Sequence, residues 1–410
     1  MEPLTTASTA AIVAGESSSA SVVPQSAVSP GAAGTGITLG CVAVLMLGLQ
    51  PLLLGALLEE HRLSVAQLTQ AATLELLALG VVAGALGAFA PRRHLRLLGG
   101  VGCLLLAVSN AGCLAGSGLS LVLWRGMSGC GGGILLWIAG GIIAFSRTPA
   151  RLSAIFVGAQ AAFQGALAAL LPVTLMPGMG ANGGLAALAA LSLASIPLLR
   201  WLPSDLPDLV KDTLGRGWIG AGACAGLLAG FFFMAAIVGF WVFVEPLATA
   251  HHVTPEISRF ADAWNLAAQL AGAVFSTVLA QRLVRVVGTV LVTACAAVLV
   301  ALALVSTASH DAPFFAALML HGFVWSIGLS FYVPLLIRAD PTRRGAMVLS
   351  GALMLGGSAG PIITGWFATE TYLAPVLVST ALLALVALSG TVVAAASRPP
   401  RAGSKLPDPD

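Results

Sequence analysis

The stretch "LVLWRGMSGCGGG" (121–133) places one arginine, Arg125, inside a run that is otherwise apolar and rich in glycine. No other charged residue occurs from Gly116 to Phe145, so this segment is long and apolar enough to cross a membrane as a helix. An ionisable side chain in the hydrocarbon core costs roughly 2.5–3.5 kcal/mol on insertion scales and normally faces the interior of a helix bundle. The stretch therefore predicts a membrane helix with a buried arginine.

The rest of the chain is equally apolar. Its 410 residues are 58% hydrophobic and 9% charged, with a mean hydropathy of +0.97. Soluble proteins normally carry about 25% charged residues, so this composition indicates a membrane protein. Splitting the chain at charges and turn residues yields twelve apolar spans, and we predict an all-α, multi-pass membrane protein. The spans are 37–57, 66–89, 97–115, 118–145, 152–174, 184–200, 218–246, 256–280, 287–307, 312–337, 345–367 and 373–396.

The least hydrophobic interval between spans, "WLPSDLPDLVKDTLGRG" (201–217), divides them into six and six. We therefore predict two six-helix bundles joined by a central loop and flanked by two tails. The first tail is rich in Ser, Thr, Ala, Gly and Pro and has no basic residue, which predicts disorder and argues against a secretory signal. The predicted units are 1–36 (disordered tail), 37–200 (first bundle), 201–217 (central loop), 218–397 (second bundle) and 398–410 (second tail).

The distribution of basic residues predicts the orientation. With the N-terminus in the cytoplasm, sixteen of the nineteen basic residues fall on the cytoplasmic side, and only Arg62, Arg125 and Arg259 do not. Both termini, with the central loop, are therefore predicted to be cytoplasmic. The 17 arginines against 2 lysines suggest a GC-rich genome, which favours a bacterial inner membrane.

An internal repeat supports the division into halves. At an offset of 190, residues 59–82 align without gaps on 249–272, which pairs Glu75 with Asn265. At an offset of 196, "LWRGMSGCGG" aligns with "MLHGFVWSIG", which pairs Arg125 with His321. Duplicated six-helix halves with a site between them at the membrane midplane are a known architecture of transporters.

Over residues 37–397 the chain resembles the major facilitator superfamily (MFS), whose fourth helix carries an Arg followed four residues later by Gly and a run of small residues. Here Leu121, Arg125, Gly129 and Gly131 match that signature. The resemblance implies two pseudo-symmetric six-helix bundles, alternating access, and a cavity lined by helices 1, 4, 7 and 10. We expect a functional monomer in the lipid bilayer, without a cofactor, that draws on the proton gradient.

Other family signatures are altered. The sequence "GALGAFAPRRHLR" (84–96) keeps the glycine and the basic pair, but Ala88 stands where the family has Asp, which puts the usual inner-gate charge network in doubt. The span 152–174 lacks the Gly-Pro-x-x-Gly-Gly ending of the family's antiporters, which favours import slightly over exchange with protons. A Gly-Pro element occurs in the span 345–367 instead, where Pro361 is expected to break or kink the helix. The expected conformational residues are Gly84, Arg92, Arg93, Gly129, Gly131 and Pro361.

Arg125 and Glu75 are the first candidates for a transport site. They lie about 11 Å and about 14 Å from the outer ends of their spans, at 1.5 Å per residue, so a pair between them is feasible. Two interpretations stay open. Arg125 either binds an anionic or polar substrate and controls the protonation of Glu75, or it forms a fixed ion pair that holds the first bundle together.

A polar stripe runs along the span 256–280. Arg259, Asp262, Asn265 and Gln269 recur at steps of three and four, so they share one helical face, which must contact protein or water rather than lipid. Asp262 is the expected carboxylate for proton coupling in this half. The alternative is a structural ion pair between Arg259 and Asp262 near the outer face.

His321 lies in the middle of its span as the repeat partner of Arg125, and an imidazole suits either a proton-linked step or a hydrogen bond to substrate. Aromatic side chains gather in the second half and predict a wall for a ring or an apolar body, although most Phe residues there are expected merely to pack. Glutamine side chains are further candidates for hydrogen bonds to the substrate, and the alternative is that they only join helices to one another. The expected substrate-binding residues, besides Arg125, His321, Asn265 and Gln269, are Gln50, Gln160, Gln164, Phe240, Trp241, Trp325 and Tyr332.

These patterns predict a proton-coupled secondary transporter for a small organic solute, an organic anion or an amphipathic aromatic compound. Proton-antiport efflux is the alternative within this class, and a non-transporting receptor or scaffold is the alternative outside it. The sequence contains no phosphate-binding GxxxxGK[ST] loop, catalytic triad or metal cluster, and its six cysteines lie in apolar segments without CxxC spacing. It also has no basic patch with interleaved aromatics, so neither an enzyme nor a nucleic-acid partner is expected.

Overall fold

A computed structural model describes residues 28–207, 219–254, 260–308, 310–366, 368 and 372–397, except for the side chain of Asp262. Its elements are all helices. In the first half of the chain they are α1 (Pro30–Glu59), α2 (Val65–Phe89), α3 (Leu95–Ala115), α4 (Gly118–Ala144), α5 (Pro149–Leu170), η1 (Leu171–Val173), α6 (Met176–Met179), α7 (Ala181–Ala194) and η2 (Ile196–Trp201). In the second half they are α8 (Ala221–Trp241), α9 (Val244–Ala250), α11 (Ala261–Leu283), η3 (Val284–Val286), α12 (Val287–Ser306), α13 (Asp311–Ala339), α14 (Arg344–Gly365) and α15 (Ala374–Ala396).

Eleven helical segments of the described chain are long and apolar enough to cross a membrane. One of them, Ala263–Ser306, is 44 residues long and contains both α11 and α12, so twelve helices of membrane length are present. The prediction of an all-α, multi-pass membrane protein with twelve spans is confirmed. Splitting the sequence at charges and turn residues found the spans because a helix in hydrocarbon needs a long run of apolar residues.

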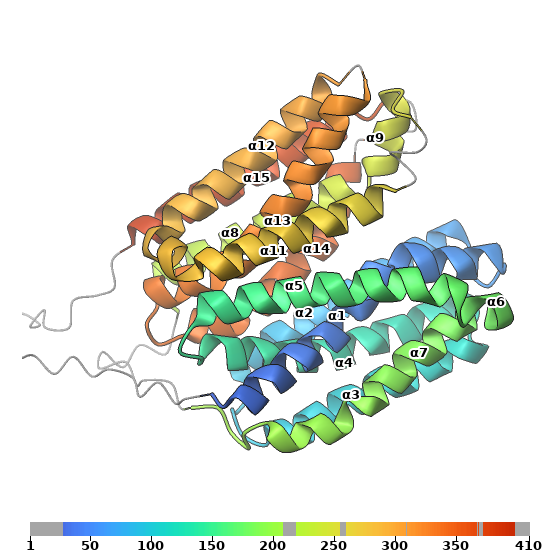
Figure 1. The fold of residues 1–410 in the computed structure, drawn as a ribbon, viewed down its shortest axis with the longest axis horizontal. Helices are drawn as coiled ribbons and strands as arrows, with labels where there is room; N and C mark the ends of the chain where they lie inside the picture. The colour runs from blue at the N-terminus through green and yellow to red at the C-terminus, as the bar shows by residue number, and fades with distance from the viewer. Residues whose placement is uncertain are drawn as a thin grey trace, which may run out of the picture.

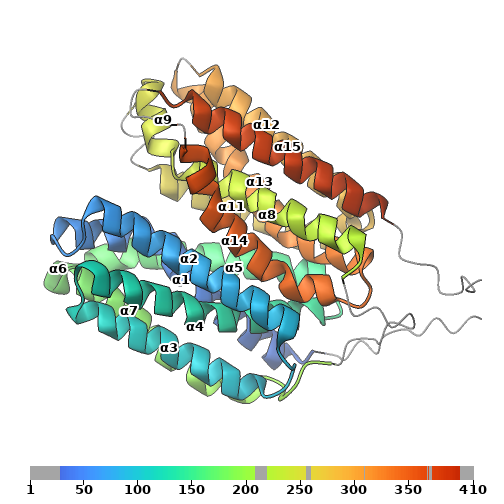
Figure 2. The ribbon, with the colours of Figure 1, turned by 180° about the vertical axis from the view of Figure 1, so that it is seen from behind.

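The helices form two groups in space (Figures 1 and 2). Helices α1 to α7 pack on one another, chiefly through α4, which contacts α2, α3 and α1, and through α3 with α7. Helices α8 to α15 pack on one another, chiefly through α8 with α14 and α15, and through α13 with α11 and α12. The two groups meet where α2 lies against α14 and where α5 lies against α11 and α13.

Glycines allow the closest of these contacts between the halves. A Cβ atom on Gly351 of α14 would lie 2.4 Å from the Cα atom of Gly84 in α2. One turn further along α2, a Cβ atom on Gly87 would lie 2.3 Å from the carbonyl oxygen of Met347. Small residues let the backbones of membrane helices approach in this way, and the α2–α14 contact depends on them.

The beginning of α1 and the end of α15 lie at the same end of the molecule, which we call the tail end (Figure 1). At this end Arg343, which precedes α14, donates to the carbonyl oxygen of Ala144 at the end of α4. Its guanidinium carbon lies 5.4 Å from the ring centre of Phe145, and burial lowers the pKa of this guanidinium from its ordinary value. The ribbons of α5 and α11 are close at the tail end and spread apart toward the end that carries α6 and α9 (Figure 1).

The start of the first bundle differs from the prediction. Helix α1 begins at Pro30, and the hydroxyl of Ser29 accepts a hydrogen bond from the backbone N–H of Ala32 at 3.1 Å. Ser before Pro is a strong start signal for a helix, and the hydroxyl of Thr35 donates to the carbonyl of Leu198 at 3.3 Å, which ties this turn to η2. The prediction of a disordered tail is therefore wrong for residues 30–36, whereas residues 1–27 lie outside the described part of the chain.

The predicted central loop is also partly ordered. Trp201 belongs to η2, and the backbone N–H of Leu206, a buried residue, donates to the carbonyl of Arg92 at 2.9 Å. Residues 208–218 lie outside the described part, as do residues 398–410 of the predicted second tail.

Candidate functional site

Arg125 and Glu75 form an ion pair inside the first half. Arg125 of α4 donates from Nη2 to Oε1 of Glu75 in α2, and from Nε to Oε2 at 3.2 Å. This is a bidentate arrangement, the strongest that a guanidinium and a carboxylate make. Arg125 is 0% exposed and Glu75 is 4% exposed, so the two charges are enclosed by protein.

Three further polar side chains, besides the thiol of Cys113, contact this pair. The third nitrogen of Arg125, Nη1, donates to Oδ1 of Asn110 in α3 at 2.9 Å. The hydroxyl of Ser128 donates to Oε1 of Glu75 at 3.3 Å, and Nε2 of Gln50 in α1 lies 3.5 Å from Oε2. The pair is thus held by groups from α1, α2, α3 and α4.

Asn110 and Ser128 were not among the predicted site residues. An amide in the middle of the apolar run "LLLAVSNAGCL" (104–114) was the only available signal for Asn110. Ser128 lies three residues after Arg125, and this spacing places both on one face of α4. That spacing was the signal that would have found it.

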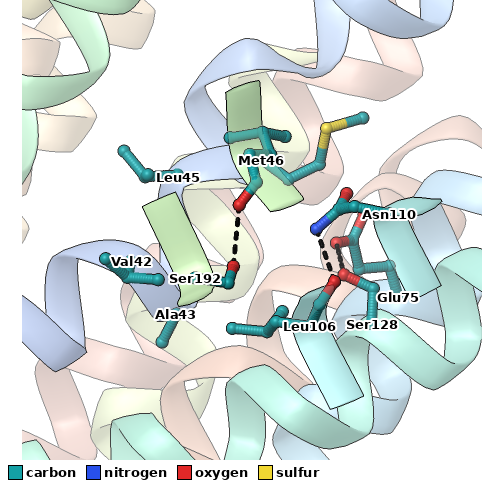
Figure 3. Close-up of a pocket in the computed structure, with 10 residues that line it drawn as sticks. Val42, Ala43, Leu45, Met46, Glu75, Leu106, Asn110, Ser128 and Ser192 are labelled. Atoms are coloured by element: carbon teal, nitrogen blue, oxygen red, sulfur yellow. Dashed lines mark hydrogen bonds between the residues drawn. The ribbon is translucent and has the colours of Figure 1, made fainter. Parts of the chain in front are cut away.

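A crevice of about 10 Å³ lies beside the pair, room for about one water molecule. Glu75, Asn110 and Ser128 stand at one edge of it, and Met46 and Ser192 stand at the other (Figure 3). The crevice lies between α1, α2, α3, α4 and α7, inside the first half rather than between the halves. Arg125 therefore meets only protein groups in this conformation.

His321 is the centre of a corresponding cluster in the second half. This residue of α13 is 1% exposed, and its Nδ1 lies 3.4 Å from Oδ1 of Asn265 in α11. Its Nε2 lies 3.1 Å from the carbonyl oxygen of Ile237 in α8, which can only accept, so Nε2 carries a proton.

The two clusters occupy matching positions in the two halves. The sequence repeat pairs Glu75 with Asn265 and Arg125 with His321. In space Arg125 contacts Glu75, and His321 contacts Asn265, so the same two positions meet in each half. A Cβ atom on Gly322 would lie 2.5 Å from the carbonyl oxygen of Asn265, which shows how closely α13 approaches α11 there. The repeat is therefore a structural one, although few residues are identical.

A comparison with solved structures identifies the fold. The solved structure of the human organic anion transporter MFSD10 (TETRAN) superposes with a TM-score of 0.61, covering 88% of this chain and 98% of that chain at 15% sequence identity. This chain has the MFS fold. No sequence-family model matches it, and no curated protein sequence is similar enough to match. In the MFS numbering of helices, α1, α4, α8 and α13 are helices 1, 4, 7 and 10.

Three of the four predicted wall aromatics surround His321 in the MFS fold. The ring centres of Phe240, Trp325 and Trp241 lie 5.0, 5.7 and 6.1 Å from that of His321, and Trp241 is stacked on the imidazole. Tyr332 lies elsewhere, with its ring centre 5.6 Å from that of Phe233 and its hydroxyl 3.2 Å from Oγ1 of Thr391.

The predicted glutamines have different surroundings. Gln164 is buried and donates to the carbonyl of Val44 at 2.7 Å, so it joins α5 to α1. Gln160 is half-buried and has no hydrogen-bond partner among the described residues. Gln269 is buried in α11, where its backbone carbonyl, not its side chain, accepts from the hydroxyl of Ser326 at 2.7 Å.

The second predicted coupling carboxylate, Asp262, lies in the first turn of α11, and its side chain is outside what the structure describes. Arg259, its possible structural partner, also lies outside the described residues. Within the part of the chain that is described, no group of three or more His, Cys, Asp or Glu side chains is placed to hold a metal.

The predicted conformational residues lie at helix contacts and at the tail end. A Cβ atom on Gly129 would lie 2.2 Å from the carbonyl oxygen of Glu75, and one on Gly131 would lie 2.9 Å from that of Gly102. The carbonyl of Arg92 accepts from the central segment, and the side chain of Arg93 is exposed. Helix α14 continues through Pro361 to Gly365, so the helix is not broken there, and a kink at Pro361 stays a prediction.

Proposed function

We propose that this protein is a proton-coupled secondary transporter that moves a small organic solute, and not an enzyme. The observation that carries the proposal is the bidentate pair of Arg125 and Glu75, which is fully enclosed among membrane helices. A charge in such a place is costly and normally serves transport or coupling. A neighbour with the same fold transports organic anions, which supports an anionic solute as the first substrate class to test.

Glu75 is the proton carrier in this proposal. While its carboxylate is charged, two of the three guanidinium nitrogens of Arg125 are bound to it. Protonation removes the negative charge and weakens the pair, and the guanidinium then has hydrogen-bond donors for an anion. Asn110, which holds the third nitrogen, keeps Arg125 in place during this exchange.

Because the proton and the anion are then loaded together, this scheme is symport, and import is the favoured direction. The cluster of His321, Trp241 and Trp325 would contact an apolar ring of the solute. Asp262 remains a second candidate for coupling. Proton-antiport efflux is the alternative: there the solute displaces the proton from Glu75 instead of arriving with it.

The contacts between the halves support alternating access. We propose that the tail end is cytoplasmic, because eleven described arginines lie near it: Arg92, Arg93, Arg96, Arg147, Arg151, Arg200, Arg282, Arg285, Arg338, Arg343 and Arg344. The contact of Arg343 with Ala144 and Phe145 then closes the cytoplasmic side in this conformation.

Proteoliposomes that contain a pH-sensitive dye test the proposal, with benzoate and salicylate as probes. We expect either anion, added outside at acidic pH, to acidify the lumen faster than in protein-free vesicles, with slower flux when the proton gradient is reversed. E75Q should abolish coupling, and R125K should reduce flux because a point charge cannot make the bidentate contact. E60Q, in the loop between α1 and α2, is the matched control.

Unchanged coupling in E75Q would refute the role of Glu75. If a probe left the vesicles faster when the outside was acidic than when both sides had the same pH, the result would favour antiport. The receptor or scaffold alternative would replace transport if the stably inserted protein moved neither probe nor any member of a wider panel of organic acids and hydrophobic cations. R125A would then give the same fluxes as the unchanged protein.

A further inference from the structure

A groove of about 470 Å³ opens at the tail end of the second half, remote from both polar clusters. It lies where α11 passes through η3 into α12, beside the last turns of α13 and α15. Arg285 of η3 and Arg338 of α13 line it, together with Thr289 of α12. Every element that forms the groove ends or begins there, so the groove lies at the level where the helices leave the membrane.

The groove has two positive charges that the described protein does not neutralise. Arg285 and Arg338 are both exposed, and neither has a hydrogen-bond or ion-pair partner among the described residues. Asp340 follows Arg338 by two positions, but its carboxylate accepts from the backbone N–H groups of Thr342 and Gly345 at 3.0 and 3.2 Å. Helices α12 and α15 contain no acidic residue.

The walls of the groove are apolar and run into the membrane. Val292 lies five residues after the start of α12, and Val392 lies four residues before the end of α15. At 1.5 Å per residue, these positions are about 6–8 Å inside the helix ends. The two helices touch at this level, because a Cβ atom on Gly288 would lie 2.5 Å from the Cβ atom of Ala395. Charges at the mouth and apolar walls below them match an amphipathic ligand.

We propose that this groove binds the headgroup of an anionic phospholipid. The phosphate oxygens accept hydrogen bonds from the two guanidinium groups and from the hydroxyl of Thr289, and an acyl chain lies along Val292 and Val392. Basic pockets between helices at the cytoplasmic membrane surface are suited to such headgroups. A soluble phosphate would use the arginines but would leave the apolar walls exposed.

Native mass spectrometry of the full chain in neutral detergent tests this assignment, with phosphatidylglycerol and phosphatidylcholine of identical acyl chains as probes. We expect one phosphatidylglycerol to be retained in preference to phosphatidylcholine. Each arginine near an anionic headgroup contributes about five-fold in affinity, so R285Q/R338Q should lower the apparent affinity on the order of 30-fold. R285K/R338K, which keeps both charges, should retain most of the binding.

R282Q is the matched control, because Arg282 is exposed one turn before Arg285 but does not line the groove. Equal losses in R282Q and R285Q/R338Q would overturn the proposal in favour of diffuse surface charge, as would unchanged binding in the double variant. Inorganic phosphate that protects the protein from heat as well as phosphatidylglycerol does would assign the groove to a soluble anion. Binding that appears only after residues 398–410 are removed would assign it to the acidic end of the chain, "LPDPD" (406–410).

Discussion

Removing one partner of the Arg125–Glu75 pair should cost far more stability than removing both. In R125L the Glu75 carboxylate, 4% exposed, keeps only Ser128 and Gln50 as donors, at 3.3 and 3.5 Å. In E75L the buried guanidinium keeps the Asn110 oxygen at 2.9 Å and the neighbouring thiol of Cys113, and neither group carries a compensating charge. A buried charge without its partner typically costs about 3–5 kcal/mol of unfolding free energy, whereas replacing both partners by apolar residues is often close to neutral.

The double variant R125L/E75L should therefore cost about 0–2 kcal/mol, although the two single costs together reach about 6–10 kcal/mol. A coupling energy of about 4 kcal/mol or more follows from these ranges. Titration with dodecyl sulfate in mixed micelles, monitored through the loss of the helical circular dichroism signal, measures the free energy of unfolding of each protein. The four proteins are the unchanged protein, R125L, E75L and R125L/E75L.

Q160L is the matched control, because Gln160 is a half-buried amide that has no hydrogen-bond partner among the described residues. Its cost should stay within about 0.5 kcal/mol. A coupling energy below about 1 kcal/mol would refute the reasoning, because it would mean that water or lipid headgroups already compensate each charge in the folded protein.

Two further predictions concern the contacts between the halves. R343A removes the bond to Ala144 and the contact with Phe145, so a cysteine placed at Ser350 near the tail end, in a variant without native cysteines, should react about five- to thirty-fold faster with a membrane-impermeant maleimide. R147A, an exposed charge at the same end, should leave that rate unchanged, and equal rates in all three proteins would contradict the proposed closure. G351V forces side-chain atoms against Gly84 of α2 and should cost about 1–3 kcal/mol in stability and slow transport. G55V, where an added Cβ atom meets nothing within 4 Å, should lower neither the thermal midpoint nor the flux.

The spans and the repeat were predictable from the order of residue types. Each span is a long apolar run with few or no charges, and hydrocarbon leaves such a run no stable structure except a helix. The repeat was visible at two positions, because Glu75 and Arg125 have polar partners in the second half at the similar offsets of 190 and 196. The depth of both residues followed from counting along their helices, which made the pair feasible before its contacts were known.

The directions of the side chains were not predictable in the same way. Successive residues of a helix differ by about 100°, and the rotation of a helix about its axis depends on all the surfaces that pack against it. Tyr332 was expected in the same aromatic wall as Trp325, and the two share one face of α13, but about two turns further along the helix Tyr332 contacts Phe233 and Thr391 instead. Asn110, which holds Arg125 in place, comes from the predicted span 97–115, which offered no charge and no repeat partner.

The stretch 121–133 illustrates both sides of this division. Composition alone required that Arg125 sit in a membrane helix and that something compensate its charge, because an isolated guanidinium is unstable in hydrocarbon. Its actual partners, Glu75 and Asn110, are 50 and 15 residues away in the sequence. They reach it because glycines such as Gly129 let α4 pack directly on α2, and this three-dimensional contact cannot be read from any single helix.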